Sequence, residues 1–339
     1  MKVREGDIIE DVNRIIFDVK GLVHPPAKII AFPRFIPDLQ GNRIRGRVAY
    51  KKIYGISERF EFLKQNFPHY IVHDPVFNEE LCEVPKEEVK KHYQPINYLR
   101  QLRHGKRLDE LERDAFDFLQ LLKDETGISW SKMGISGSLL VKLHTANSDI
   151  DPIIYGSENC RKVYEALKFL MQDAKGNVKA YTQEGLRKLY AFRVKDTIMS
   201  FEDFMRTESR KVLQGKFKTR DYFVRFVKDW NEIREEYGSF QYRNMGYARI
   251  RAEVEDDSEA ILTPCTYELK NDKVLSGTRI SQIEEIASFR GRFCEQARNG
   301  ETIIAQGKVE QVTDRKHNCK SFRLLLGNKP SDYMVLASS

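Results

Sequence analysis

The feature that most constrains this chain is a Gly-Ser pair followed, after ten residues, by an acidic-apolar-acidic triplet. The pair is Gly137-Ser138 and the triplet is Asp149-Ile150-Asp151, with the apolar residues Ile153-Ile154 close behind it. Because side chains alternate along a strand, Asp149 and Asp151 are expected on one face and Ile150 in the core. The stretch therefore predicts a strand that carries two carboxylates about 6–7 Å apart on one face.

These residue types suit chemistry on phosphate groups. Two carboxylates at that spacing can share hard divalent cations such as Mg²⁺. The backbone N–H groups of a Gly-Ser turn, with the serine hydroxyl beside them, can bind phosphate oxygens, because glycine lets the chain approach closely. An Asp-x-Asp triplet alone is common in turns, and a Gly-Ser pair alone is common in loops. Their combination at this spacing, with Ser148 before the triplet, favours a functional site.

Over residues 137–151 the chain resembles the polymerase β nucleotidyltransferase superfamily. The mark of that superfamily is Gly-Ser, about ten residues and an acidic-apolar-acidic triplet. The tetrapeptide Ser148-Asp149-Ile150-Asp151 is similar to the Ser-Asp-Ile-Asp of its minimal members. The motif covers a short part of the chain, whereas a more general similarity to uncharacterised archaeal polymerase β domain proteins extends over most of it.

The resemblance implies a mixed-sheet palm that binds a nucleoside triphosphate and Mg²⁺. Gly137 and Ser138 would hold the β and γ phosphates, with Ser148 as a further nucleotide-binding residue. Asp149 and Asp151 would bind the metal ions. The reaction would transfer a nucleoside monophosphate to an acceptor hydroxyl and release pyrophosphate.

In the superfamily a third carboxylate comes from a neighbouring strand, binds metal and activates the attacking hydroxyl. Glu253 is the first choice for this role, because it shares a predicted strand face with Arg249 and Arg251. Asp221 and Glu255 are alternatives.

Two positions depart from the superfamily pattern. Minimal members usually have an Arg-Gly pair after Gly-Ser, but here the chain reads Leu139-Leu140-Val141-Lys142. Pro152 follows the second aspartate, where an aliphatic residue is usual. Because proline cannot donate a ladder hydrogen bond, we expect its strand to lie at a sheet edge or to bulge there.

The overall composition is that of a highly charged globular protein. Its 339 residues include 57 Lys or Arg and 50 Asp or Glu, and the net charge of +7 is compatible with a polyanionic partner. There is no run of eighteen apolar residues and no apolar signal-peptide core, so we expect no membrane span and a cytoplasmic location. Five scattered cysteines indicate reduced thiols rather than disulfides or a zinc site.

A basic stretch is the main candidate for contact with nucleic acid. It spans a predicted helix end and the strand after it, and its members are Arg206, Arg210, Lys211, Lys216, Lys218 and Arg220. Such a stretch can hold triphosphate or a nucleic-acid backbone, although a run of charges is often only a solvated face.

The pattern along the chain predicts an α+β protein in three parts. Residues 1–105 indicate an N-terminal α+β module, and residues 106–262 the nucleotidyltransferase core with a helical insertion. Residues 263–339 indicate a small β-rich module, with a barrel as the candidate architecture.

Several individual elements are predicted within these parts. An apolar stripe predicts a helix over residues 108–122 that Gly127 ends. Thr182 and Ser200 are helix N-cap candidates. Further expected elements are helices over residues 8–19, 85–91 and 280–287, and a hairpin over residues 28–50 that turns at Gly41-Asn42.

Together these features predict a Mg²⁺-dependent nucleotidyltransferase whose expected acceptor is RNA. A protein hydroxyl is the second enzymatic option. The alternative from another class is a nucleic-acid-binding protein that keeps the fold without turnover. The nucleotide's base, the acceptor and the oligomeric state stay open on the sequence alone.

Overall fold

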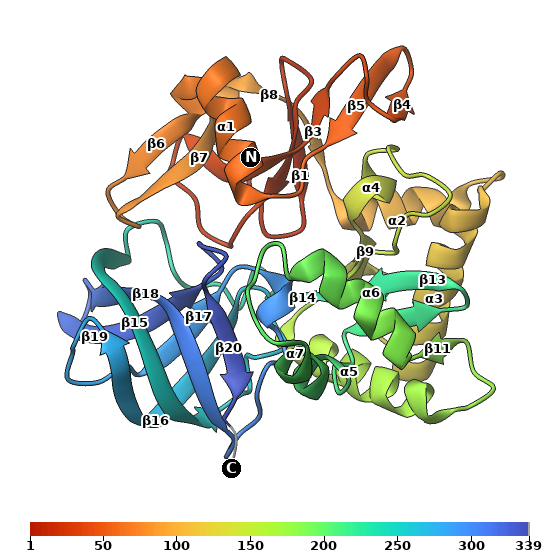
Figure 1. Cartoon of the computed structure of the whole chain (residues 1–339). Helices are drawn as coiled ribbons and strands as arrows, with labels where there is room; N and C mark the ends of the chain where they lie inside the picture. Colours follow the sequence, from red (N-terminus) through yellow and green to blue (C-terminus); the bar gives the residue numbers. More distant parts are fainter. Residues whose placement is uncertain (338–339) are drawn as a thin grey trace. The chain divides into compact units, whose positions relative to one another are not determined.

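The Gly-Ser pair and the aspartate triplet lie in the first of two units into which the chain divides (Figure 1). The computed structural model describes residues 1–337. The first unit comprises Met1–Val72, Leu81–Ala180 and Val212–Arg234, and the second comprises His73–Glu80, Tyr181–Lys211 and Glu235–Ser339. The sequence predicts three parts instead, and the difference arises because the N-terminal sheet and the motif sheet share one unit. The mixed α+β character is confirmed.

An antiparallel sheet of N-terminal strands forms one part of the first unit. Its strands follow the order β4-β5-β3-β2-β1-β8, and β7 pairs with β3 and β6. The bounds are β1 Ile8–Asp11, β2 Ile16–Val19, β3 Lys28–Pro37, β4 Arg43–Arg45, β5 Val48–Lys52, β6 Ile71–Asp74, β7 Glu79–Pro85 and β8 Val89–Tyr93. Helix α1, Ile56–Asn66, contributes Leu63 to the core of this sheet, beside Ile9 and Phe17.

The predicted helix over residues 8–19 is wrong, because this segment is the β1–β2 hairpin. The Asp11 carboxylate closes the turn by accepting a hydrogen bond from the Ile15 N–H at 2.7 Å, and Arg14 adopts a left-handed φ of 65°. The apolar residues of the segment are mostly β-branched, and such side chains favour a pleated surface over a helix.

The predicted helix over residues 85–91 is also wrong. The chain makes one 3₁₀ turn, Lys86–Glu88, and then enters β8, which pairs with β1. The predicted hairpin over residues 28–50 is correct in its pairing, since β3 and β5 are antiparallel. Its tight turn is misplaced, because β4 intervenes and the β4–β5 turn lies at Gly46, with a φ of 63°.

Two helices lead from the N-terminal sheet to the motif: α2, Pro95–His104, and α3, Glu110–Thr126. The prediction of α3 is confirmed, and Gly127 ends it with a left-handed φ of 67°. At its start, Asp109 and Glu112 form a capping box, in which each side chain accepts a hydrogen bond from the other residue's N–H.

The motif belongs to a three-stranded sheet with the order β14-β10-β9. Strand β10, Pro152–Tyr155, is antiparallel to β9, Met133–Ile135, and parallel to β14, Arg225–Val227. The expectation of an edge or bulged strand at Pro152 is therefore wrong. Pro152 is the first residue of the central strand, a position that tolerates a missing N–H.

Short helices and a second small sheet complete this part. The helices are α4, Gly137–Leu140, and α5, Ser157–Gln172. The sheet pairs β11 Val178–Lys179, β12 Gln214–Phe217 and β13 Arg220–Phe223, and β13 leads directly into β14.

The second unit is built around a sheet that closes on itself. The order is β15-β16-β17-β19-β18, and β15 also pairs with β18, while β20 extends beside β18. The bounds are β15 Phe240–Asp256, β16 Cys265–Gly277, β17 Glu285–Ser288, β18 Thr302–Asp314, β19 Cys319–Leu326 and β20 Tyr333–Leu336. Residues 263–337 supply most strands of this closed sheet. The sheet also includes β15, which the sequence assigns to the core.

Two helices precede the barrel in the chain, α6 Gln183–Arg193 and α7 Phe201–Glu208. The predicted caps are confirmed, because Thr182 accepts from the Gly185 N–H and Ser200 from the Asp203 N–H. The predicted helix over residues 280–287 is wrong. Its second half is β17, whose backbone groups pair with strands on both sides. Within residues 1–337, no helix is long and apolar enough to cross a membrane.

Candidate active site

Gly137 is the residue that brings the two halves of the motif together. It starts α4 with a left-handed φ of 64°, and the Asp151 carboxylate lies directly against its α-carbon. A β-carbon at this position would lie 1.8 Å from Asp151 Oδ2. Glycine is therefore required here both by the backbone conformation and by the close approach of the aspartate.

The serines around this glycine differ in how their hydroxyls are satisfied. Ser136 Oγ donates to the Gly6 carbonyl at 2.7 Å, and the Ser136 N–H donates to the Asp151 carbonyl at 2.9 Å. Ser138 is only 3% exposed, yet its hydroxyl has no hydrogen-bond partner among residues 1–337. Buried polar groups are nearly always paired, so an unsatisfied hydroxyl at Ser138 is consistent with a missing ligand.

The aspartate triplet extends β10 toward the Gly-Ser pair. Ile150 is fully buried and forms a parallel bridge with Tyr222 of β13, with its N–H donating to the Asp221 carbonyl at 2.9 Å. Alternation then puts Asp149 and Asp151 together on the other face, as the sequence predicts. Within the described part of the chain, neither carboxylate makes a hydrogen bond or an ion pair.

The electrostatic surroundings oppose ionisation of Asp151. Burial and the charge of Asp149 raise the pKa of Asp151 to about 7, against the influence of Arg225, Lys52 and Arg34. Two neighbouring like charges oppose each other's ionisation, and neither is in a direct ion pair among the described residues. The pair therefore has the character of a site that a divalent cation would stabilise.

A third carboxylate lies next to the pair on the neighbouring strand. Asp149 and Asp221 each precede one member of the Ile150–Tyr222 bridge, so they lie side by side on the same face of the sheet. The Asp221 side chain is about half exposed and pairs with Lys216 at 2.9 Å. From the sequence, Asp221 is predicted only as an alternative to Glu253.

Glu253, the first choice from the sequence, belongs to the second unit. It lies on β15, where it pairs with Lys270 at 3.3 Å and accepts a hydrogen bond from Asn271 at 3.3 Å. Glu255 lies on the same strand. Their roles as metal ligands stay predictions.

Ser148 holds the loop that precedes the triplet. Its hydroxyl accepts a hydrogen bond from the Thr145 N–H at 3.0 Å and contacts Arg43 at 3.5 Å. Arg43 also donates to the Leu143 carbonyl, and Arg45 donates to the Val141 carbonyl at 3.4 Å. The N-terminal sheet thus fixes the loop between the Gly-Ser pair and the aspartates.

The departure from the superfamily pattern after Ser138 has a packing explanation. Leu139, Leu140 and Val141 are all buried, so these positions belong to the core of the first unit. Lys142, the next residue, has a left-handed φ of 57° and ion-pairs with Glu112 at 2.7 Å.

The predicted basic stretch is occupied by intramolecular partners. Lys218 pairs with Asp114 at 2.8 Å and with Asp117 at 2.7 Å, and Arg220 pairs with Asp114 at 2.7 Å. The remaining pairs are Arg206–Asp203, Arg210–Glu301, Lys211–Glu208 and Lys216–Asp221. The stretch is also divided, because residues 206–211 belong to the second unit and residues 216–220 to the first. Its role in nucleic-acid binding stays a prediction.

A second acidic group lies at the start of α3. Ligand atoms of Asp109, Glu112 and His144 lie within 4.8 Å of one another, which is close enough to hold a metal ion. Their side chains already have partners, however. His144 contacts Asp109 at 2.7 Å, and Glu112 accepts hydrogen bonds from Tyr98 at 2.9 Å and from Lys142.

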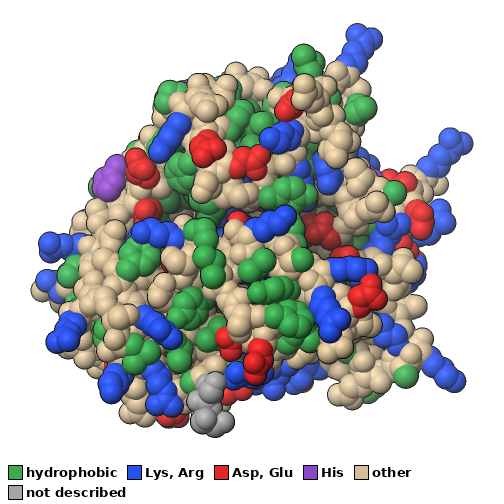
Figure 2. All heavy atoms as spheres, viewed as in Figure 1, with side chains coloured by type: hydrophobic (Ala, Val, Ile, Leu, Met, Phe, Trp, Pro, Cys, Tyr) green, Lys and Arg blue, Asp and Glu red, His purple; other side chains and the backbone are tan. Residues whose placement is uncertain are grey.

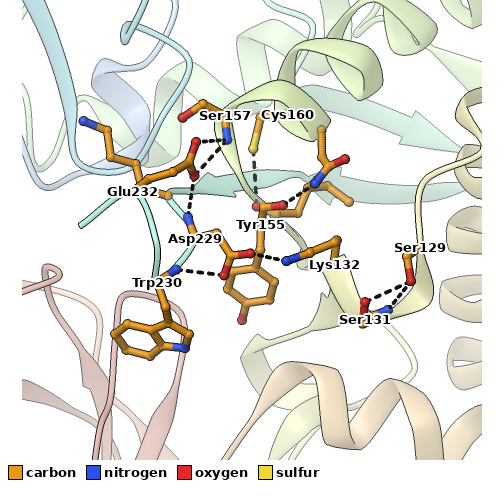
Figure 3. Close-up of polar contacts among 12 residues, drawn as sticks. Ser129, Ser131, Lys132, Tyr155, Ser157, Cys160, Asp229, Trp230 and Glu232 are labelled. Carbon is orange, nitrogen blue, oxygen red and sulfur yellow. Dashed lines mark hydrogen bonds and ion pairs between the residues drawn. The ribbon is translucent and has the colours of Figure 1, made fainter. Parts of the chain in front are cut away.

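The other end of β10 is fixed by a polar network (Figure 3). The Glu232 carboxylate accepts hydrogen bonds from the N–H groups of Ser157 and Asp229, and Asp229 pairs with Lys132. Burial opposes ionisation of Asp229, but hydrogen bonds from Lys132, the Trp230 N–H and Arg4 lower its pKa to about 2. This network ties the strand that carries the aspartates to the loop after β14.

Comparison with known proteins shows similarity to a relative along nearly the whole length of the chain. It is 34% identical to the uncharacterised protein MJ1086 of Methanocaldococcus jannaschii over 326 residues, which cover 93% of each chain. No family model matches the chain, and no solved structure matches it. The expected similarity to an uncharacterised archaeal protein is confirmed, whereas the superfamily assignment stays a proposal. The chain belongs to the same family as MJ1086.

Proposed function

We propose that the protein is a Mg²⁺-dependent nucleotidyltransferase that transfers a nucleoside monophosphate from a nucleoside triphosphate to an acceptor hydroxyl, with RNA as the expected acceptor. One observation carries the proposal. The Asp151 carboxylate packs against the α-carbon of Gly137, and the next residue, Ser138, has a buried hydroxyl with no partner among residues 1–337. A phosphate cradle and a pair of unpaired carboxylates thus share one place in the fold.

The residues of the site fit both a triphosphate and a hard cation. Ser138 would offer its hydroxyl to a phosphate oxygen, and Gly137 lets the Asp151 carboxylate lie close to this turn. Asp149 and Asp151 would hold Mg²⁺, because carboxylate oxygens are its preferred protein ligands. When bound, the metal would neutralise phosphate charge and stabilise the attacking and leaving oxygens. In this proposal the β14-β10-β9 sheet is the palm.

Asp221 is our choice for the third carboxylate. It shares a sheet face with Asp149, and its half-exposed side chain can accept a proton from an incoming hydroxyl.

The direct test is transfer of label from each of the four common nucleoside triphosphates, with Mg²⁺ present, to total RNA or to protein. Transfer of label to RNA supports the proposal as stated. Labelling of protein alone would move the acceptor to a protein hydroxyl. Absence of any transfer, with triphosphate binding retained, would favour a binding protein with an inactive fold.

The choice between the two third-carboxylate candidates is tested by Asp221→Asn and Glu253→Gln. We expect Asp221→Asn to reduce kcat by roughly 100-fold with little change in KM, the size of effect that removal of a general base has. Glu253→Gln should leave kcat near the wild-type value. The reverse pattern would return the role to Glu253. Glu158→Gln, at an exposed position on α5, is the matched control.

A further inference from the structure

The outer side of the barrel carries a cationic face on two adjacent strands, β15 and β16. We define it by Arg249, Arg251 and Lys273, which are all exposed. The intervening residues Ile250 and Ala252 are buried inside the barrel, so both arginines point outward.

The three side chains of the cationic face are close together. Arg249 and Arg251 are two residues apart on β15, a spacing of about 6.7 Å. Lys273 of β16 stands directly opposite Arg251 in the antiparallel register. Like charges in directly opposed positions destabilise a sheet, so this arrangement has a cost that an anionic ligand would relieve.

The cationic face differs from the predicted basic stretch over residues 206–220 in having no anionic partner among the described residues. Among residues 1–337, Arg249, Arg251 and Lys273 form no ion pair and no side-chain hydrogen bond. The predicted basic stretch over residues 206–220 is ion-paired throughout. Figure 2 shows Lys and Arg side chains over the region where Figure 1 draws β15, β16 and β19, with acidic side chains mainly at its lower margin.

We propose that the cationic face binds the phosphodiester backbone of a single-stranded nucleic acid. A compact group of three unpaired cations matches a polymer with one negative charge per nucleotide. Arginine suits this role because its planar fork can donate two hydrogen bonds to one phosphate. Binding through these three cations is directed at the backbone, with little base preference and a strong dependence on salt.

This inference goes beyond nucleotidyl transfer, because the cationic face lies in the unit that does not contain Asp149 and Asp151. Binding can be measured without Mg²⁺ or nucleoside triphosphate. A negative result for one proposal therefore does not contradict the other.

The test is the affinity of the full chain for a labelled single-stranded RNA oligonucleotide of mixed sequence, measured across a salt series. In the triple variant Arg249→Gln, Arg251→Gln, Lys273→Gln we expect affinity at low salt to fall at least 10-fold. The slope of log K against log salt should flatten by about 2, because each phosphate contact to a single strand contributes roughly 0.7. All three side chains point into solvent, so the variant should fold, and its thermal midpoint checks this.

A charge-matched control separates the effect of the cationic face on binding from the effect of net charge. Lys162, Lys168 and Lys188 are exposed on helices and paired with glutamates three or four residues away. Their triple replacement by Gln removes the same charge and should leave the slope nearly unchanged. Equal loss in both triple variants, or none in either, would overturn the proposal.

Two further ligands identify what the face recognises. A single-stranded DNA of the same sequence should compete with the RNA if the backbone alone is bound, and failure to compete would restrict the ligand to RNA through its 2′-hydroxyls. Polyglutamate of similar length should compete poorly. Equal competition by polyglutamate would overturn the assignment to a nucleic acid.

Discussion

Two groups of carboxylates in the first unit have opposite surroundings. At the start of α3, Asp109, Glu112 and Asp114 each have cationic or hydrogen-bonding partners. In the motif, Asp149 and Asp151 share one face of a strand without such a partner among the described residues. Hydrogen bonds lower the pKa of all three α3 carboxyls despite their burial, whereas burial and Asp149 raise the pKa of Asp151.

The difference separates carboxylates that hold the fold together from carboxylates that weaken it. The α3 group attaches Lys142, His144, Lys218 and Arg220 to one helix end, so its charges are used within the protein. The motif pair contributes repulsion, which a protein tolerates where a ligand supplies the missing charge. Short distances between ligand atoms, as in the Asp109–Glu112–His144 group, do not by themselves distinguish a structural group of carboxylates from a ligand site.

The largest expected effect is on the rate of transfer. Asp149→Asn and Asp151→Asn should each lower the rate by on the order of 1,000-fold, because each removes a charge that holds the cation, and metal stabilisation supplies several kcal/mol. Asp114→Asn should retain most of the wild-type rate at a temperature where it is folded. Near-wild-type transfer by the motif variants in Mg²⁺ would contradict this contrast between the two groups of carboxylates.

The second effect is on stability and concerns α3. Asp114→Asn should reduce the free energy of unfolding by about 2–3 kcal/mol, because it removes two charge-assisted hydrogen bonds, from Lys218 and Arg220. Urea unfolding near neutral pH measures this difference.

The pH dependence of that difference follows from the lowered pKa of Asp114. Burial opposes ionisation, but Lys218 and Arg220 outweigh it, so the stabilisation is present above the ordinary value of 3.8 and is lost as the pH falls below it. Wild type and Asp114→Asn should therefore converge in acid. A difference that stays constant down to pH 3 would show that the carboxylate is not the source.

The smallest expected effect is a gain in stability rather than a loss. Without divalent cations, Asp151→Asn should raise the thermal midpoint by roughly 2–6 °C, because it removes a partly buried charge that faces Asp149. The raised pKa of Asp151 means that the gain appears above its ordinary value of 3.8 and is complete by about pH 7. Differential scanning calorimetry in EDTA measures it. Adding Mg²⁺ should stabilise wild type more than the variant, and a destabilised Asp151→Asn would contradict this account of the pair.

Local signals in the sequence were sufficient for several elements. The apolar stripe of α3 and the stop at Gly127 are confirmed, as are the caps Thr182 and Ser200, because these features depend on residues within a turn or two of each other. Residues 8–19 were misassigned because apolar spacing fits a helix there, while the β-branched residues and the turn at Asp11–Arg14 favour a hairpin. The spacing of apolar residues along a segment does not reveal which other strand will pair with it.

The motif illustrates the boundary between what sequence determines and what tertiary structure decides. Alternation along a strand is a property of the backbone itself, so the shared face of Asp149 and Asp151 followed from the sequence, as did the need for glycine in a close turn. The neighbour of Asp149 is Asp221, more than seventy residues away, because β13 pairs beside the triplet. Likewise, Lys218 and Arg220 are paired, while Arg249 and Arg251 form no ion pair among residues 1–337. A residue's charge is fixed by its type, but its partners depend on which strands and helices pack against it, and only the folded chain decides that.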